Sequence, residues 1–399
     1  MSSDVIASAT LSFRKRLIIL LLVVIVAGMS QGMLLPLLSI MLEEADVSSS
    51  LNGINSAAMY IGIFCTMFLV EKPVRRFGYK KVITAGILLI TFANILFPFT
   101  ELLAVWFLLR FIVGVGDSLL HYTTQLWIIS SSPAEGRGKY ISFYGMAYGI
   151  GFSLGPLGIN LLPLGKAVPF IISSLFFTSV LLLVLRLTNE LPERIKKEAA
   201  QENRFKATYR AAWFVLIPGL LYGLMESSMN SSFPLYGLRI ELDQHWISLL
   251  LMAFGIGGLI LQLPLGMLSD RIGRKPVLIS CGIVGSLAFF LVPAAGSNIG
   301  LLFILFAIAG GVVGSFYSLG LAYAADILPR AILPTANVIA SIHFSIGSMI
   351  GPTLGGYSIH YISIYSIFLF LGSVFLIFAL LGFVFRAKRK AEITTGING

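Results

Sequence analysis

The sequence predicts an all-α polytopic membrane protein with twelve transmembrane helices, arranged as two pseudo-repeated six-helix bundles. Three observations support this fold class. Of the 399 residues, 57% are hydrophobic and only 12% are charged, whereas about 25% of residues are charged in soluble domains. Apolar segments long enough to cross a bilayer recur along the whole chain. Glycine motifs of the first half of the chain also recur about 195 residues later, in the second half.

Twelve apolar segments are the predicted membrane spans, because a transmembrane helix needs about 20 mainly apolar residues. They cover residues 17–42, 51–71, 80–99, 102–131, 138–161, 166–186, 211–237, 245–268, 276–295, 299–327, 332–358 and 361–385. The first span follows a polar stretch and is long enough to cross the membrane, so we predict a retained helix and no cleavable signal. The hydrophilic segment 187–210 is the predicted cytoplasmic linker between an N-terminal six-helix bundle (1–186) and a C-terminal six-helix bundle with a short basic tail (211–399).

Basic residues are distributed unevenly between the two sides of the predicted membrane. Of the 28 Lys and Arg residues, 25 fall in the two termini and in every second loop between predicted spans, which all lie on the same side of the membrane as the termini. Cytoplasmic segments carry an excess of Lys and Arg, so we expect a multi-pass protein of the plasma membrane with both termini in the cytoplasm. The net charge of +10 therefore reflects topology, and we expect no nucleic-acid partner. Four tryptophans near span ends are expected to be interfacial anchors: Trp106, Trp127, Trp213 and Trp246.

A glycine-containing basic run, Gly266–Lys275, connects the eighth and ninth predicted spans and reads G-M-L-S-D-R-I-G-R-K. Gly266 and Gly273 lack a Cβ atom, so they would let helix ends approach closely and the backbone turn tightly. Asp270 could cap the following helix or pair with a basic neighbour. The run resembles the signature loop of the major facilitator superfamily of secondary transporters. The matching positions are Gly266, Asp270, Arg271, Gly273, Arg274 and Lys275.

This resemblance implies the major facilitator fold, in which the loop is thought to form a cytoplasmic gating latch. The first half of the chain carries an altered copy at residues 71–81. Arg75 takes the place of the family's aspartate, and Glu71 takes the place of its first glycine. Because Glu71 and Arg75 are four residues apart, we expect them to form a local ion pair on a helix.

Two glycine motifs carry the internal repeat. They are Gly151-x-x-x-Gly155-Pro156 and, 196 residues later, Gly347-x-x-x-Gly351-Pro352. Glycines at this spacing let membrane helices pack closely. The first motif also resembles part of the superfamily's antiporter motif, but Ile159 and Asn160 stand where that motif has a glycine pair. The resemblance is therefore partial, and it is strongest to bacterial twelve-helix drug/proton antiporters.

The span 102–131 carries three ionisable residues, Arg110, Asp117 and His121, which share one helix face with Gly114. Ionisable groups inside a membrane are costly and usually functional. The run from Arg110 also resembles a second family motif, whose arginine is associated with proton or substrate handling in proton-coupled members. We predict that these three residues bind protons or substrate. The alternative is an Arg110–Asp117 ion pair that only stabilises the bundle.

Glu226 lies near the middle of the span 211–237. Burial favours the neutral form of a carboxyl group, and a proton carrier must accept a proton, so we predict a role in proton coupling or in binding a cationic substrate. The alternative is a carboxylate that is permanently paired with a basic group. Gln31, Asn230 and His343 are further candidates for lining a cavity, although a lone histidine on an apolar helix is more often a hydrogen-bonded packing residue.

Together these features predict a secondary active transporter that works by alternating access, with proton-coupled efflux of small amphiphilic compounds or drugs. We expect no catalytic residues, metal or cofactor, since no phosphate-binding loop, metal cluster or nucleophile–base set is present, and the proton gradient would supply the energy. The expected partners are a small-molecule substrate, protons and the lipid bilayer, and we expect a monomer. Two alternatives stay open: proton-coupled uptake of a sugar or other metabolite (or lipid-precursor transport), and a non-transporting membrane sensor or scaffold.

Overall fold

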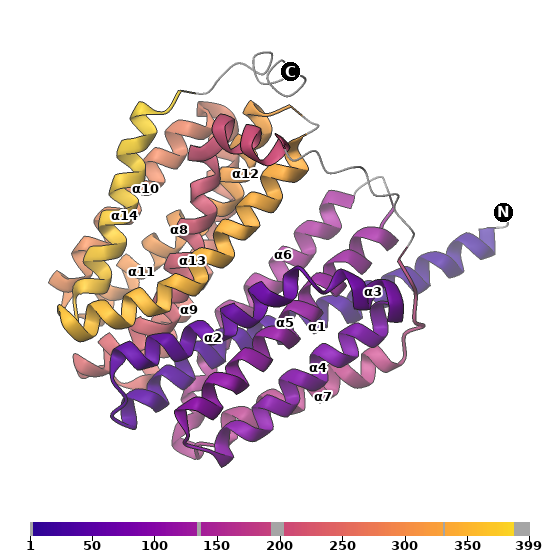
Figure 1. Ribbon diagram of the computed structural model, residues 1–399, viewed down its shortest axis with the longest axis horizontal. Coiled ribbons are helices and arrows are strands. Elements are labelled where there is room, and N and C mark those ends of the chain that lie inside the picture. The colour runs from indigo at the N-terminus through magenta and orange to yellow at the C-terminus, as the bar shows by residue number, and fades with distance from the viewer. Residues whose placement is uncertain (1–2, 134–136, 193–202, 330–331, 387–399) are drawn as a thin grey trace. The chain divides into compact units, whose positions relative to one another are not determined.

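The computed structural model describes residues 3–133, 137–192, 203–329 and 332–386, and every regular element in these ranges is a helix (Figure 1). The α-helices are α1 (Ser3–Glu44), α2 (Ser49–Met67), α3 (Glu71–Phe77), α4 (Tyr79–Leu96), α5 (Leu103–Ser131), α6 (Arg137–Leu154), α7 (Val168–Leu185), α8 (Asn203–Arg239), α9 (Gln244–Ile272), α10 (Arg274–Ala295), α11 (Ile299–Gly314), α12 (Phe316–Ile327), α13 (Leu333–Tyr361) and α14 (Ser366–Val384). Two 3-10 helices, η1 (Phe97–Phe99) and η2 (Gly155–Leu164), follow α4 and α6. The predicted all-α class is confirmed.

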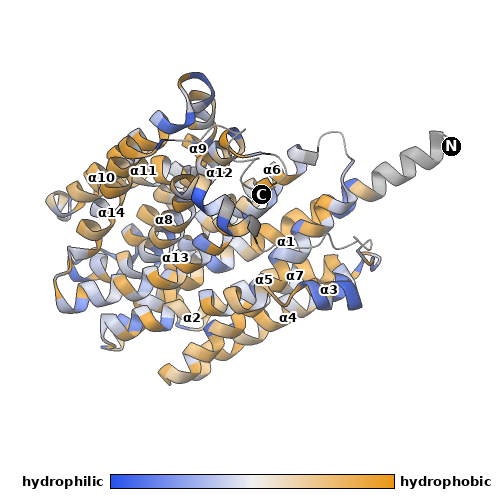
Figure 2. Cartoon of the chain, turned by 45° about the horizontal axis from the view of Figure 1, so that its top comes forward, coloured by the Kyte–Doolittle hydropathy of each residue, from blue (hydrophilic) through white to orange (hydrophobic). Residues whose placement is uncertain are grey.

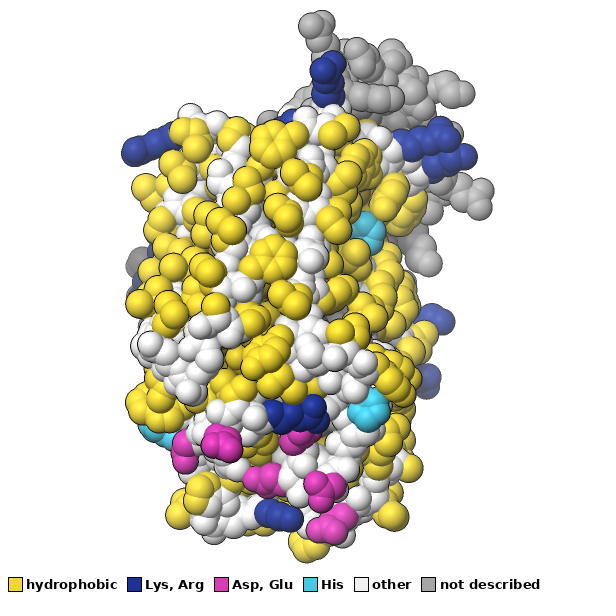
Figure 3. All heavy atoms as spheres, turned by 90° about the vertical axis from the view of Figure 1, so that its left-hand side faces the viewer, with side chains coloured by type: hydrophobic (Ala, Val, Ile, Leu, Met, Phe, Trp, Pro, Cys, Tyr) yellow, Lys and Arg dark blue, Asp and Glu magenta, His cyan; other side chains and the backbone are white. Residues whose placement is uncertain are grey.

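Membrane-length helices run through both halves of the described chain. Eleven helices are long and apolar enough to cross a membrane, and the number is twelve if α2 and α3, which are bent by 59° at their junction, form one span. Figure 2 shows apolar residues along the long helices, whereas the short helix α3 is hydrophilic. On the face in Figure 3, apolar side chains cover the middle, acidic side chains gather near one end, and Lys and Arg lie mainly near the other. This pattern fits a protein embedded in a bilayer.

The helices group into two compact units. The first unit contains residues 1–37 and 58–195, and the second contains residues 38–57 and 196–399. The second unit therefore includes a stretch that the sequence places in the first bundle. Of the predicted linker, residues 193–202 lie outside the described residues, as does the tail from residue 387, and the described part after residue 202 belongs to α8.

Contacts within the second unit explain why residues 38–57 belong to it. Arg239, at the end of α8, donates from Nε to Glu43 Oε1 at 2.6 Å and from Nη2 to Ser49 Oγ at 2.5 Å. A Cβ atom on Gly356 of α13 would lie only 2.2 Å from the Ser49 carbonyl oxygen, so the two backbones are in close contact. The end of α1 and the start of α2 thus pack against α8 and α13.

Glycines bring the first and fifth spans of each bundle into backbone contact. In the first unit, a Cβ on Gly151 of α6 would lie 2.2 Å from the Ile25 carbonyl oxygen of α1. In the second unit, a Cβ on Gly347 of α13 would lie 2.1 Å from the Leu220 carbonyl oxygen of α8. The two glycine motifs identified in the sequence therefore have the same structural use in both units.

The first unit differs from the prediction at two tryptophans, since Trp106 is also buried and its indole N–H donates to the Thr100 carbonyl oxygen at 2.7 Å. Trp127 is fully buried, and its ring stacks on Tyr79 of α4 with the ring centroids 5.3 Å apart. It is a core residue and not an interfacial anchor, so that expectation was wrong. Its indole N–H has a partner inside the protein, the carboxylate of Glu190, which removes the need for water at this position.

Substitution of Gly151 by alanine should lower the thermal stability of the purified protein, because the added Cβ would force α1 and α6 apart. Overpacking of this kind costs about 1–3 kcal/mol. Gly145→Ala is the matched control on the same helix, since a Cβ there would meet no atom within 4 Å. It should be neutral or stabilising, because alanine in a helix is more favourable than glycine by about 1 kcal/mol. Equal unfolding temperatures for the two variants in detergent would contradict this packing.

Candidate functional site

A polar cluster in the first unit joins side chains from α1, α5 and α6. His121 of α5 lies between Asp117 of the same helix, at 3.4 Å from Nε2 to Oδ1, and Tyr144 of α6, at 2.8 Å from Nδ1 to the phenol oxygen. Beside this pair, Tyr148 of α6 donates its hydroxyl to Gln31 Oε1 of α1 at 2.7 Å. The His121 and Tyr148 rings meet edge to face with centroids 5.2 Å apart. The five side chains therefore form one continuous polar surface.

Both ring nitrogens of His121 face polar side chains. When the imidazole is neutral, one ring nitrogen donates and the other accepts, and when it is protonated both donate. The distance to Asp117 is an ion-pair distance and is long for a direct hydrogen bond. A protonated His121 would be balanced by the Asp117 carboxylate, which is only 5% exposed. The arrangement thus places the Asp117 carboxylate beside a group that can balance its charge.

Arg110 lies two turns before Asp117 on α5 and is 2% exposed. Tyr60 of α2 lies within electrostatic range of its guanidinium group. Between Arg110 and Asp117, Gly114 lets α2 approach closely, since a Cβ there would lie 1.9 Å from the Met59 carbonyl oxygen. The predicted helix face of α5 is therefore present, and α2 covers the part of it around Gly114.

Glu226 is a buried acid of the second unit. It lies on α8 and is 4% exposed. Tyr222, one turn earlier, is its electrostatic neighbour, and Asn230, one turn later, donates from Nδ2 to the Glu226 backbone carbonyl at 2.8 Å. Among the described residues of its own unit, none forms an ion pair with the Glu226 carboxylate. In the described part of this unit, the buried acid is therefore not neutralised by a basic side chain.

The remaining cavity candidates make local contacts. His343 of α13 bonds through Nδ1 to the Leu216 carbonyl oxygen of α8 at 3.0 Å and meets the Tyr209 ring edge to face. Because a carbonyl oxygen can only accept, Nδ1 carries the proton, and this is the arrangement of a hydrogen-bonded packing histidine. Asn230 likewise satisfies the backbone of its own helix.

Three tyrosines of these clusters were not singled out from the sequence. Tyr144 and Tyr148 are four residues apart on α6, and Tyr222 is four residues before Glu226 on α8. Such spacing places side chains on one helix face. A search for tyrosines one turn from a buried ionisable residue could have found Tyr222, but the pairing of Tyr144 with His121 depends on contact between α5 and α6, which the sequence does not show.

The basic loop of the second unit connects α9 to α10 through Gly273, whose φ of +97° strongly favours glycine. Arg274 forms ion pairs with Asp270 of α9 and, at 3.3 Å, with Asp326 of α12. Asp270 thus pairs with a basic neighbour, while the N-cap of α10 is Gly273. The expectation of close helix approach at Gly266 was wrong, because a Cβ there would meet nothing within 4 Å.

The altered copy in the first unit keeps the backbone turn but has a different charge pattern. Gly78, between α3 and α4, has a φ of +86°. The predicted Glu71–Arg75 ion pair is confirmed, with 2.7 Å between Oε1 and Nε. Lys80 donates from Nζ to the Leu185 carbonyl oxygen at the end of α7, as Lys275 donates to the Phe385 carbonyl oxygen just after α14, both at 2.7 Å. The two copies therefore occupy equivalent places in their units.

Comparison with known proteins identifies the family. A family model described as Major Facilitator Superfamily matches residues 20–246 and 219–398 of the chain. The chain belongs to the major facilitator superfamily. It is 38% identical over 345 residues to YfkF, an uncharacterised MFS-type transporter of Bacillus subtilis (strain 168), with 85% of this chain and 87% of the relative covered. It is also 24% identical over 398 residues to multidrug resistance protein 2 of the same organism, with 94% and 96% covered.

Solved structures of the superfamily share the fold. The nucleoside transporter NupG superposes with a TM-score of 0.76 at 15% identity, covering 94% of this chain and 98% of NupG. A bacterial homologue of the human lysosomal transporter Spinster superposes with a TM-score of 0.67 at 13% identity, with 97% of each chain covered. This major facilitator protein is therefore a membrane transporter and not an enzyme, and its fold has the predicted two bundles.

Substitution of Gly273 by alanine should destabilise the protein by about 1–3 kcal/mol, because a residue with a Cβ is strained at this φ. Gly266→Ala is the matched control in the same loop motif, at a helical position with free space around it. The unfolding temperature of Gly273→Ala should fall, whereas that of Gly266→Ala should stay level or rise. A fall for both variants, or for Gly266→Ala alone, would show that the positive φ is not the decisive feature.

Proposed function

We propose that this major facilitator protein is a proton-coupled exporter of small amphiphilic compounds. The observation that carries the proposal is the presence of buried titratable groups on membrane-spanning helices: Asp117 with His121 in the first unit, and Glu226 in the second. Ionisable side chains at membrane depth are expensive. A packing role would be served equally well by apolar residues, so the retention of these groups favours a function that needs protonation.

The two sets of groups would take different parts in the transport cycle. Glu226 has no ion-pair partner among the described residues of its unit, so a proton or a cationic substrate can neutralise it in turn. Competition between proton and substrate for one carboxylate couples their opposite movements. The Asp117–His121–Tyr144 contacts form a chain along which a proton can be held or passed. Alternating access would then let inward proton flow drive export, with the proton gradient as the energy source and no cofactor.

Two further features support this proposal. Multidrug resistance protein 2 of Bacillus subtilis aligns with 94% of the chain, although at only 24% identity. The uneven distribution of Lys and Arg supports a location in the plasma membrane with both termini in the cytoplasm, where an exporter would take up its substrates. We propose that the protein acts as a monomer, since one chain contains both compact units.

A second candidate is proton-coupled uptake of a polar metabolite. The observation that favours it is the density of hydrogen-bonding groups in the first unit, where His121, Tyr148 and Gln31 adjoin one another. Such groups could bind hydroxyl or amide groups of a polar substrate. The direction of proton movement on substrate addition distinguishes the two candidates. In proton-coupled export the proton and the substrate cross the membrane in opposite directions, whereas in proton-coupled uptake they cross in the same direction.

Substitution of Glu226 by glutamine should reduce proton-coupled transport more than tenfold while leaving insertion and folding intact, because the amide keeps the shape but cannot take up a proton. The measurement uses everted membrane vesicles with a proton gradient and a pH-sensitive dye, to which lipophilic cations and neutral antibiotics are added in turn. Glu101→Gln is the matched control, since the same chemical change is made at an exposed position just before α5. It should behave as the wild type.

Three outcomes of this experiment differ in meaning. Compound-dependent proton release that is present in the wild type and in Glu101→Gln but lost in Glu226→Gln supports the proposal. Release at the wild-type level from a well-expressed Glu226→Gln protein would remove Glu226 from the coupling step. No response of the wild type to any compound would favour the uptake candidate, which right-side-out vesicles with labelled sugars and other polar metabolites would then test.

A further inference from the structure

A basic cavity of about 540 Å³ lies in the first unit, beside the part of α1 around Lys15 and the end of α7. Three basic side chains line it: Lys15 and Arg16 of α1, and Arg186, which directly follows α7. The rest of the lining is mainly apolar and includes Ile18 and Leu183. The transport groups described above lie elsewhere, so this basic cavity has no role in the proposed proton coupling.

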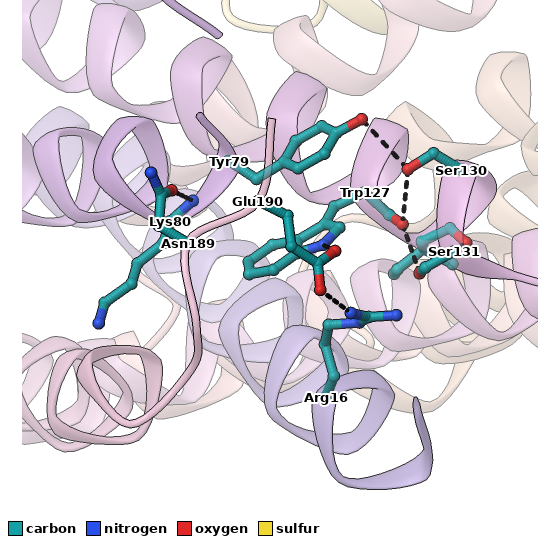
Figure 4. Close-up of polar contacts among 9 residues, drawn as sticks. Arg16, Tyr79, Lys80, Trp127, Ser130, Ser131, Asn189 and Glu190 are labelled. Carbon is teal, nitrogen blue, oxygen red and sulfur yellow. Dashed lines mark hydrogen bonds and ion pairs between the residues drawn. The ribbon is translucent and has the colours of Figure 1, made fainter. Parts of the chain in front are cut away.

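One side of the basic cavity is fixed by the carboxylate of Glu190. Figure 4 shows Arg16, Trp127 and Glu190 pointing toward one another. Arg16 Nη1 lies 2.5 Å from Glu190 Oε1, and the Trp127 indole N–H donates to Glu190 Oε2 at 2.8 Å. The Arg16 guanidinium also lies over the Trp127 ring, 5.7 Å from its centroid. Because both carboxylate oxygens have partners, Glu190 and Arg16 are held in one arrangement.

The segment that carries Glu190 is itself attached to the start of α4. The Tyr79 backbone N–H donates to the Glu190 carbonyl oxygen at 2.9 Å. Asn189 makes two further bonds, from Nδ2 to the Phe77 carbonyl oxygen at 2.9 Å and from the Lys80 backbone N–H to its Oδ1 at 3.1 Å. Figure 4 shows Asn189, which lies on this segment, beside Lys80 of α4. The wall of the basic cavity is thus a built part of the fold.

The charges that line the basic cavity do not balance. Glu190 offsets the charge of Arg16, and two basic groups, Lys15 and Arg186, are left. Both are exposed, and in the described part of the chain neither has an ion pair or a side-chain hydrogen bond. Two cations that face one cavity without a carboxylate partner make a site for an anion.

The surroundings of the basic cavity indicate which anion it takes. Ile18, Leu182 and Leu185 are 58%, 58% and 49% exposed. Ile18 lies near the start of the first candidate span, and the two leucines lie at the end of α7. A soluble anion would leave this apolar surface uncovered, whereas a phospholipid would place its phosphate on the basic groups and its acyl chains along the apolar side chains. The cavity volume is also within the usual range for small-molecule sites.

We propose that this basic cavity binds the phosphate headgroup of an anionic phospholipid, with Lys15 and Arg186 as direct partners and Arg16 held in place by Glu190. The lipid would bridge α1 and α7, which are the first and last spans of the first unit. Bound in this way, it would stabilise the folded first unit against unfolding.

The test measures lipid binding to the purified full-length chain by native mass spectrometry, with phosphatidylglycerol as the anionic probe and phosphatidylcholine as the neutral one. The double variant Lys15→Gln/Arg186→Gln should bind phosphatidylglycerol about 30-fold more weakly than the wild type, since each basic group near an anionic headgroup contributes about 1 kcal/mol and 1.4 kcal/mol is tenfold. Lys81→Gln/Lys139→Gln is the matched control, because it removes the same charge at exposed positions outside the cavity. It should bind like the wild type.

A second variant tests the cavity without a change of charge. Thr188→Trp should fill part of the basic cavity and weaken phosphatidylglycerol binding, while the unfolding temperature without lipid shows whether the protein is intact. Inorganic phosphate and glycerol phosphate form a further arm of the test. Equal weakening in the two double variants, no weakening in either, or binding of these soluble anions as strong as that of the lipid would overturn the proposal.

Discussion

Close contact between helix backbones is the constraint on which the arrangement of each unit depends. In a membrane, apolar side chains gain little by leaving lipid for protein, so helices associate through close packing and hydrogen bonds. Gly32 and Gly151 meet this need in the first unit, since a Cβ on either would lie 2.2 Å from a carbonyl oxygen of the other helix. Gly223 and Gly347 do the same in the second unit, at 2.2 and 2.1 Å. Side chains next to these contacts are then held in fixed positions.

The polar clusters follow from this packing. Gly28 and Gly151 bring α1 against α6, and this contact sets Tyr148 beside Gln31. Tyr144, one turn earlier on α6, reaches His121 of α5. In the second unit, α8, which carries the buried Glu226, packs closely against α13 at Gly223 and Gly347. Glu226 and Tyr144, the partner of His121, therefore lie on helices that the glycines of the repeat position, whereas α5 is positioned by Gly114.

Features that depend on local sequence could be predicted. The spans, the turn at Gly273 and the Glu71–Arg75 pair each follow from the pattern of residues within a few turns of chain. Features that depend on contacts between distant residues could not. Arg274 pairs with Asp326, 52 residues away, and Trp127 is buried because Glu190 satisfies its indole N–H. Of the candidate site, the sequence indicated the ionisable residues but not Tyr144 and Tyr148, since the contacts of these two tyrosines join different helices.

The two copies of the basic loop show how one structural requirement is met with different residues. Both keep a glycine of positive φ and a lysine that bonds a carbonyl oxygen at the end of a later span. In the second unit, Arg274 links α10 to α9 and α12 through two acids. In the first unit, the corresponding ion pair stays within α3 and connects no other helix. The connection is made instead by the segment after α7, where Glu190 joins α1, α4 and α5. The first copy, which has no aspartate at this position, is therefore accompanied by a helix-joining contact that the sequence motif does not contain.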